Sequence, residues 1–360
     1  MDVVGHALTH RHLPSLAALA GIEAQYDRIQ EELRAVLDAL PRQPSGAMPR
    51  SSLTSSGYPV ELGLTIDRGR PTGLKYTVDL LVSGSASAIL DSVWRETAPV
   101  VHRFADAAGR AELERYVSLL VFQSSGAIDG VYWSVAYARD GPPRMKIHVV
   151  GRGDALNRSV LQNLVPRVVA PVALDAALAG AELSGAVSAH FVGLSVDPNG
   201  AVRCKLYLLT NPFLDLRTVT RLAAALGLST GRALSLLRWY RRFIGHHVGQ
   251  LGSFGVGVEL DNRSRNAGVE AYAYPSHANR ARLQRRIDAH ASAGRCLAEL
   301  WTSLQPSEPS GADAPLYLAG CGTETASFAR LGRMTVYLGV ATEHLQASAA
   351  VGVREGLRTK

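Results

Sequence analysis

Basic and phenolic side chains recur at alternate positions in five short segments of the chain. In 202–209, Arg203, Lys205 and Tyr207 alternate with apolar residues. Residues two apart on a β-strand point to the same face of the sheet. The other four segments carry polar sets of the same kind: Lys75, Thr77 and Asp79; Arg144, Lys146 and His148; Glu270, Tyr272 and Tyr274; and Arg333, Thr335 and Tyr337. The recurrence favours one shared site over five separate exposed faces.

Two kinds of chemistry follow from these residue types. Lysine and arginine bind phosphate oxygens through charge-assisted hydrogen bonds, each contributing about 1.5–3 kcal/mol. Tyrosine rings attract a desolvated cation by about 2 kcal/mol. Together they indicate a site in which an allylic diphosphate ionises. A single solvated sheet face would show the same alternation in one strand, but five repeats favour an enclosed site.

Five β-hairpins are predicted from period-2 alternation around turn residues. They repeat weakly, about every 60 to 70 residues. The turn 197–200, Asp-Pro-Asn-Gly, is a strong turn signal. The predicted strand pairs are 60–66 with 74–82, 131–138 with 144–150, 189–196 with 202–209, 254–260 with 269–274, and 316–319 with 333–340.

Helical patterns lie before and between these hairpins. The predicted helical ranges are 16–40, 87–122, 155–179, 214–248 and 277–304. Ten antiparallel strands would leave exposed edges unless the sheet closes on itself. We therefore predict an α+β fold in which a closed ten-stranded antiparallel barrel is surrounded by helices. The apolar strand faces would then meet the helices, and the polar faces would line the lumen. An open sheet with helices on one face is the alternative.

We expect one domain over residues 1–360. Within it, residues 1–57 form a helical lead-in, 58–341 the barrel and 342–360 a C-terminal segment. These boundaries follow the first and last predicted strands.

Composition excludes several classes of protein. The net charge is +7, but no dense Lys/Arg block with interleaved aromatics predicts nucleic-acid binding. No apolar stretch is long and uninterrupted enough to predict a membrane span. The three cysteines, Cys204, Cys296 and Cys321, are too few and scattered for a disulfide framework or zinc site. These features favour a cytoplasmic monomer or homodimer that acts on small molecules.

No metal site and no cofactor are predicted. Enzymes that hold a magnesium diphosphate need clustered carboxylates, and the sequence has no Asp-Asp-x-x-Asp pattern. His6, His10 and His12 are more consistent with a flexible terminus than with a metal site. The basic side chains would neutralise the diphosphate, so magnesium is not expected to be essential.

The first predicted hairpin resembles a known family. The segments 58–64 (YPVELGL) and 74–78 (LKYTV) are similar to the opening hairpin of the dimethylallyltryptophan synthase family, indole prenyltransferases with the ABBA, or PT-barrel, fold. The similarity is to a bacterial member and continues through the later strands to about residue 340. It implies that Glu61 is the catalytic residue that accepts the indole N–H, and that Lys75 meets the diphosphate.

The later strands resemble the diphosphate cage of this family. The resemblance implies a diphosphate-binding set of Lys75, Lys146, His148, Arg203, Lys205, Tyr207, Tyr272 and Tyr337. It implies a cation-shielding set of Tyr207, Tyr272, Tyr274 and Tyr337. His148 stands where several family members have tyrosine. The segment 131–138 lacks the lysine base found in some members that act on free tryptophan.

The expected activity is metal-independent transfer of a dimethylallyl or geranyl group from its diphosphate to the indole ring of tryptophan or a tryptophan-derived compound in secondary metabolism. Two alternatives remain open at this stage. One is a prenyltransferase for a phenol or another non-indole aromatic acceptor. The other is a non-catalytic barrel that binds a hydrophobic anion.

Overall fold

The structure of the protein is a computed structural model. It describes residues 3–44, 49–54, 56–124, 128–151, 189–196, 202–210, 224, 229–243, 252–260, 269–275, 280–288, 316–324 and 333–340. No helix within these ranges has both the length and the apolar character needed to cross a bilayer.

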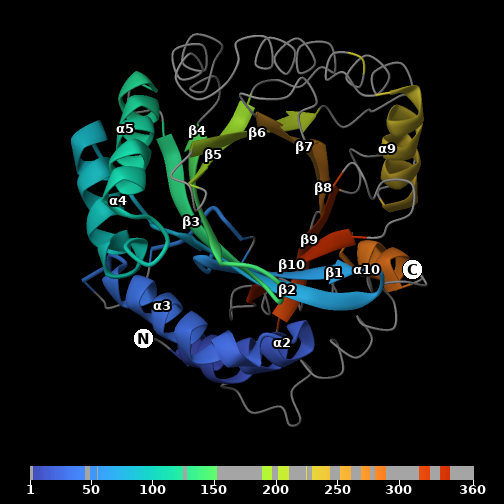
Figure 1. Cartoon of the computed structure of the whole chain (residues 1–360), viewed down its shortest axis with the longest axis horizontal. Helices are drawn as coiled ribbons and strands as arrows, with labels where there is room; N and C mark the ends of the chain where they lie inside the picture. Colours follow the sequence, from blue (N-terminus) through green and yellow to red (C-terminus); the bar gives the residue numbers. More distant parts are fainter. Residues whose placement is uncertain are drawn as a thin grey trace, which may run out of the picture.

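Ten antiparallel strands form a closed barrel (Figure 1). Each strand pairs with the next along the chain, and β1 pairs with β10 to close the sheet. The predicted closed barrel is therefore confirmed, and the open-sheet alternative is wrong. The strands are β1 (Val60–Asp67), β2 (Arg70–Asp79), β3 (Ile128–Ala138), β4 (Arg144–Gly151), β5 (Ala189–Val196), β6 (Val202–Thr210), β7 (Gly252–Leu260), β8 (Val269–Pro275), β9 (Leu316–Glu324) and β10 (Arg333–Val340).

The helices lie outside the barrel (Figure 1). They are α1 (Val3–Ala7), the π-helical segment η1 (Leu8–His12), α2 (Leu13–Ala20), the short 3₁₀ segment η2 (Glu23–Gln25), α3 (Tyr26–Ala39), α4 (Ala86–Val101), α5 (Ala107–Gln123), α9 (Thr230–Phe243) and α10 (Arg280–Asp288). The predicted helical range 155–179 lies outside the described residues. Those at 214–248 and 277–304 are described only over α9 and α10 and the single residue 224.

The first hairpin closes through a two-residue turn. Arg68 and Gly69 have φ angles of 48° and 78°, and Asp67 pairs directly with Arg70. Two consecutive positive φ angles give a turn whose twist matches that of the flanking strands. β2 therefore begins at Arg70, four residues before its predicted start, and it ends at Asp79 and not at residue 82.

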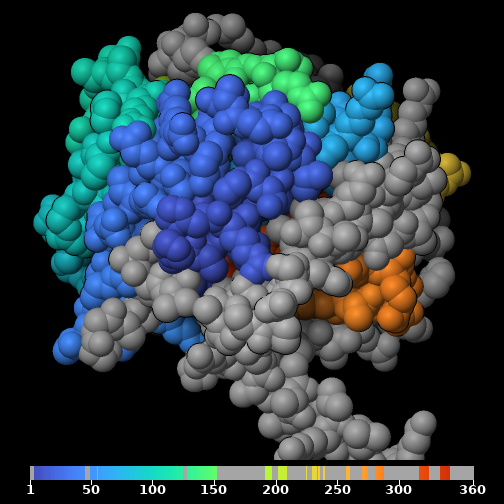
Figure 2. Space-filling model, turned by 90° about the horizontal axis from the view of Figure 1, so that it is seen from below, coloured from blue at the N-terminus to red at the C-terminus, as the bar shows by residue number. Residues whose placement is uncertain are grey.

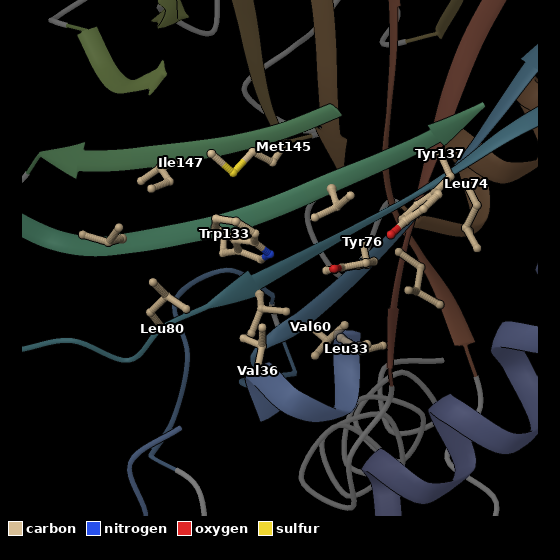
Figure 3. Close-up of a cluster of buried hydrophobic side chains, with 14 of the residues drawn as sticks. Leu33, Val36, Val60, Leu74, Tyr76, Leu80, Trp133, Tyr137, Met145 and Ile147 are labelled. Atoms are coloured by element: carbon tan, nitrogen blue, oxygen red, sulfur yellow. The ribbon is translucent and has the colours of Figure 1, made fainter. Parts of the chain in front are cut away.

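The outer face of the sheet packs against the helices, as the alternation predicts. Leu33 and Val36 of α3 lie against β1, β2 and β3, where Tyr76 and Trp133 are fully buried (Figure 3). Burying side chains of this size contributes on the order of 1.5–3 kcal/mol each. Since these residues occupy one face of each strand, the opposite face is left for the lumen.

A buried carboxylate connects α3 to this outer layer. Glu32 is fully buried and accepts hydrogen bonds from Arg28 at 2.9 Å and from the Tyr137 hydroxyl. Arg103 lies 3.5 Å away as a second cation. A buried charge is costly unless it is paired, so this network fixes the position of α3 on the barrel.

The lead-in differs from the prediction of one helix over residues 16–40. The chain is helical from Val3 to Ala20, and α2 ends at Gly21, whose φ of 65° favours glycine at this position. The expected flexible terminus is also wrong, because His12 is buried. Figure 2 shows the N-terminal segments packed as a block on one face of the molecule.

The predicted range 87–122 contains two helices. Each begins at a capping side chain: Ser85 accepts from the Ala88 amide before α4, and Asp106 accepts from the Gly109 amide before α5. Such caps satisfy amides that have no partner within the helix.

Candidate active site

A cavity of about 350 Å³ lies in the barrel lumen. Most of its lining residues lie on the predicted polar faces of the strands; Met145, which was predicted on the apolar face, and Val196 line it as well. The lining residues are Thr65, Lys75, Ser134, Ala136, Arg144, Met145, Lys146, Ser195, Val196, Arg203, Lys205, Tyr207, Glu259, Glu270, Tyr272, Thr335 and Tyr337. Seven residues of the predicted site are among them: Lys75, Lys146, Arg203, Lys205, Tyr207, Tyr272 and Tyr337.

The other predicted site residues adjoin this set without lining the cavity. The ring of His148 lies 5.5 Å from that of Tyr207, and the ring of Tyr274 lies 6.2 Å from that of Tyr337. Glu61 interacts electrostatically with Lys75. The structure thus brings the whole predicted set into one region of the lumen.

Three lysines form the cationic part of the site. Burial, together with the charge of Lys205, lowers the pKa of Lys146 to about 7. Burial also lowers the pKa of Lys75, although Glu61 opposes the shift. Like charges held together in a poorly solvated space disfavour their ionised forms. An anion bound among them would relieve this repulsion.

Two arginines extend the cationic surface toward solvent. Arg203 is exposed and lies 3.5 Å from Glu259. Arg144 also lines the cavity and is exposed. Arg203 was predicted as a diphosphate ligand, whereas Arg144 was recognised only as part of the polar face.

Lys205 is held by two neighbours on β8. Its Nζ donates to the Tyr272 hydroxyl at 2.8 Å and forms an ion pair with Glu270. Tyr272 in turn donates to Glu270. Glu270 was predicted on the polar face of its strand but not as a site residue.

Aromatic rings form a continuous wall beside the lysines. Tyr272 lies 5.6 Å from Tyr207 and 6.3 Å from both Tyr274 and Tyr337. Phe191 stacks on Tyr207 with a centroid distance of 4.0 Å. Burial raises the pKa of each of these four phenols well above the usual value, so their hydroxyl groups stay neutral. The sequence pattern did not single out Phe191.

The rings of this wall already face positive charge. Lys205 Nζ lies 5.2 Å from the Tyr207 centroid and 5.4 Å from the Tyr272 centroid. Lys75 Nζ lies 5.7 Å from the Tyr337 centroid. These distances are within the range of cation–π attraction. The wall can therefore stabilise a cation that forms beside it.

Glu61 projects from β1, which pairs with β10 and β2 at the seam of the barrel. Glu61 is 7% exposed. Burial raises the pKa of its carboxyl group to about 7, although the charge of Lys75 opposes that shift. Within the described part of the chain, Lys75 is the charged group that acts on its carboxyl group, and no hydrogen bond is among the influences on its pKa.

His148 is buried, and its Nε2 lies 3.1 Å from the Ser134 hydroxyl. Burial, then the charges of Lys75 and Lys146, lower its pKa well below 6.5. The imidazole is therefore neutral, and it offers a hydrogen bond and an aromatic surface but no positive charge.

Glycines make room for these large side chains. A Cβ on Gly193 would lie 2.9 Å from Lys146 Cδ and 3.1 Å from His148 Nδ1. A Cβ on Gly322 would lie 2.9 Å from the ring of Tyr272. Glycine at every second position, as in 255–257 and 320–322, was the sequence signal for this space, but it was not recognised.

Within the described ranges, no group of three or more His, Cys, Asp or Glu side chains could hold a metal ion. His6 and His10 have ring centroids 4.3 Å apart, and His10 contacts Arg34.

The barrel ringed by helices has the fold of aromatic prenyltransferases. Solved structures similar to this chain include a 6-dimethylallyl tryptophan synthase (TM-score 0.67, 14% identity, 91% of this chain and 94% of that one). PriB, described as a prenyltransferase, has a TM-score of 0.68 at 18% identity, with 95% and 97% of the two chains covered. AnaPT from Neosartorya fischeri has a TM-score of 0.65 at 16% identity, with 92% and 91% covered.

At these identities the similarity establishes the fold. The sequence matches no family model and no curated protein. A 6-dimethylallyltryptophan synthase from Micromonospora olivasterospora, solved in complex with DMASPP and Trp, is also similar (TM-score 0.64, 15% identity, 94% of this chain and 97% of that one).

Proposed function

We propose that this protein is an aromatic prenyltransferase. It transfers a dimethylallyl or geranyl group from its diphosphate to the indole ring of tryptophan or of a tryptophan-derived compound. One observation carries this proposal: the lysine cluster and the tyrosine wall meet in a single cavity, with Lys205 5.2 Å from the Tyr207 ring and 5.4 Å from the Tyr272 ring. The lysine cluster can bind a diphosphate, and the tyrosine wall can stabilise an allylic cation.

The similar structures support the choice of acceptor. One is named a 6-dimethylallyl tryptophan synthase, and another was solved with brevianamide F and DMSPP. Both have the same barrel and match more than 90% of this chain. An indole acceptor is therefore the best-supported choice for the site beside Glu61.

The reaction begins when the bond between C1 of the prenyl group and the diphosphate oxygen breaks. Both electrons leave with the diphosphate, whose charge Lys75, Lys146 and Lys205 neutralise. Each such charge-assisted hydrogen bond contributes about 1.5–3 kcal/mol. Because the lysines are in place before the charge develops, little reorganisation is needed.

The allylic cation then lies against the tyrosine wall. The rings of Tyr207, Tyr272, Tyr274 and Tyr337 stabilise it and exclude water. The indole N–H donates to the Glu61 carboxylate, which raises the electron density of the ring. The ring attacks C1 or C3 of the cation, and loss of a ring proton restores aromaticity.

We propose that no metal ion is required, because the cations of the lumen perform the task that Mg²⁺ performs in carboxylate-rich prenyl enzymes. Lys75, Lys146 and Lys205, with Arg203 at the rim, face the place where the diphosphate would lie. Turnover in excess EDTA is expected to equal turnover with Mg²⁺. A loss of activity in EDTA that Mg²⁺ restores would contradict this part of the proposal.

The function is tested by incubating the protein with dimethylallyl or geranyl diphosphate and one acceptor at a time. The acceptors are tryptophan, a tryptophan-containing cyclic dipeptide and tyrosine, and products are identified by mass spectrometry. Prenylated indole with release of diphosphate is the expected result. Product with tyrosine alone would indicate a phenol-specific enzyme, and absence of product with every pair would indicate a non-catalytic barrel.

A further inference from the structure

A carboxylate lies in the cavity that we assign to an anion. Glu270 lines the cavity and forms an ion pair with Lys205, the most deeply buried of the three lysines. It also accepts a hydrogen bond from Tyr272. Its side chain is 27% exposed, whereas that of Lys205 is 6% exposed.

This carboxylate is charged at neutral pH. Burial alone would raise the pKa of Glu270, but the ion pair and hydrogen bond with Lys205 and the hydrogen bond from Tyr272 together oppose it, and the pKa falls to about 2. Lys146 adds to the same effect. Glu270 therefore offsets part of the repulsion among the lysines.

The same contacts place Glu270 in conflict with a diphosphate. Lys205 Nζ has three N–H bonds, and it already contacts both Glu270 and the Tyr272 hydroxyl. A diphosphate that binds Lys205 would bring a second anion against the Glu270 carboxylate. Two anions on one buried ammonium repel each other strongly at short range.

We propose that Glu270 is the resident counter-anion of the ligand-free cavity, and that a diphosphate must displace its carboxylate from Lys205 in order to bind. This inference rests on the proposed function of the cavity. It also links binding to the aromatic wall, because Tyr272 donates to the carboxylate that moves. Glu270 thereby sets the affinity for diphosphate without being a ligand of it.

The test measures binding of inorganic diphosphate to the full-length protein by calorimetry. Displacing Glu270 lowers the affinity, so Glu270→Gln, which keeps the shape and removes the charge, is expected to tighten binding about tenfold. The comparison variant is Glu259→Gln, which removes the same charge from the same cavity. Glu259 pairs with the exposed Arg203, where solvent screens the charge, so a smaller gain than that of Glu270→Gln is expected.

A double-mutant cycle separates this mechanism from a general change in cavity charge. If Glu270 acts through Lys205, Glu270→Gln gives no gain in a Lys205→Met background. An equal gain in both backgrounds, an equal gain from Glu259→Gln, or unchanged or weaker binding by Glu270→Gln would each overturn the proposal.

A crystal structure of the wild-type protein with inorganic diphosphate tests the same inference without a substitution. The Glu270 carboxylate is expected to have left Lys205, and an intact ion pair beside a bound diphosphate would overturn the inference. A wild-type protein that binds no diphosphate would overturn the proposed function as well. If diphosphate binds but Glu270→Gln does not tighten it, only the present inference fails.

Discussion

Gly257 on β7 lies directly beneath the side chain of Lys205 on β6. A Cβ on Gly257 would come within 2.7 Å of Lys205 Cε and 2.9 Å of the Tyr272 ring. Atoms do not approach this closely without displacement, so the absence of a side chain here allows Lys205 to extend over β7 toward β8. The position of the central lysine therefore depends on a residue that has no functional group.

Gly257→Ala is expected to weaken binding of inorganic diphosphate about tenfold, because Lys205 and Tyr272 must both move. Calorimetry measures the affinity, and circular dichroism checks that the fold persists. Gly231→Ala is the matched control, since a Cβ there meets nothing within 4 Å. Wild-type affinity in Gly257→Ala would show that Lys205 adapts at no cost.

The alternation on each strand could be predicted because it is local. Arg203, Lys205 and Tyr207 share a face whatever the strand pairs with, so the polar lumen followed from period 2 alone. The contact between Lys205 and Glu270 could not be predicted in this way. These residues lie on β6 and β8, with β7 between them, and they meet across β7 where Gly257 has no side chain.

The length of β9 shows a second limit. The sequence predicted a strand that ends at residue 319, whereas β9 continues to Glu324. Gly320 and Gly322 weaken the strand signal because glycine has low β-propensity. In the structure these glycines face Tyr274 and Tyr272, whose rings occupy the space that other side chains would fill. The two glycines that weaken the strand signal are therefore the residues that make room for the tyrosine rings of the site.

The pKa of Glu61 predicts an acidic limit to activity. The carboxyl group must be ionised to accept an indole N–H, and burial raises its pKa to about 7. kcat/KM, which reports groups of the free enzyme, is expected to rise with pH through about 7. Glu61→Gln should remove this limb and lower turnover by about 10²- to 10⁴-fold. An unchanged profile in the variant would exclude Glu61 from the reaction.

The pKa of Lys146 predicts that diphosphate binding weakens at high pH. Its pKa is lowered to about 7, so the ammonium loses its charge as the pH rises through that value. Binding of inorganic diphosphate is therefore expected to weaken above about pH 7. In Lys146→Arg the guanidinium stays charged, and binding should hold to higher pH. Equal weakening in this variant would mean that another group titrates.

The Tyr137 hydroxyl is predicted to stabilise the fold without affecting catalysis, because it lies on the outer face and donates to buried Glu32. Tyr137→Phe is expected to lower the free energy of unfolding by about 1–3 kcal/mol. Tyr76→Phe is the comparison: its hydroxyl is 3.4 Å from Glu32, so a smaller loss is expected. Urea denaturation measures both, and a change in kcat for either variant would contradict the assignment to the outer face.

Tyr337 tests whether the phenol rings or their hydroxyl groups shield the cation. Its ring lies 5.7 Å from Lys75 Nζ and within 6.3 Å of the Tyr272 and Tyr274 rings. Since the attraction comes from the ring face, Tyr337→Phe should keep the wild-type ratio of prenylated product to dimethylallyl alcohol. Tyr337→Ala opens the wall to water and should shift that ratio several-fold toward the alcohol. Chromatography of both products from one reaction gives the ratio.

Equal partitioning in the alanine variant and the wild type would mean that Tyr337 does not face the cation. A large shift in the phenylalanine variant would assign the effect to the hydroxyl group.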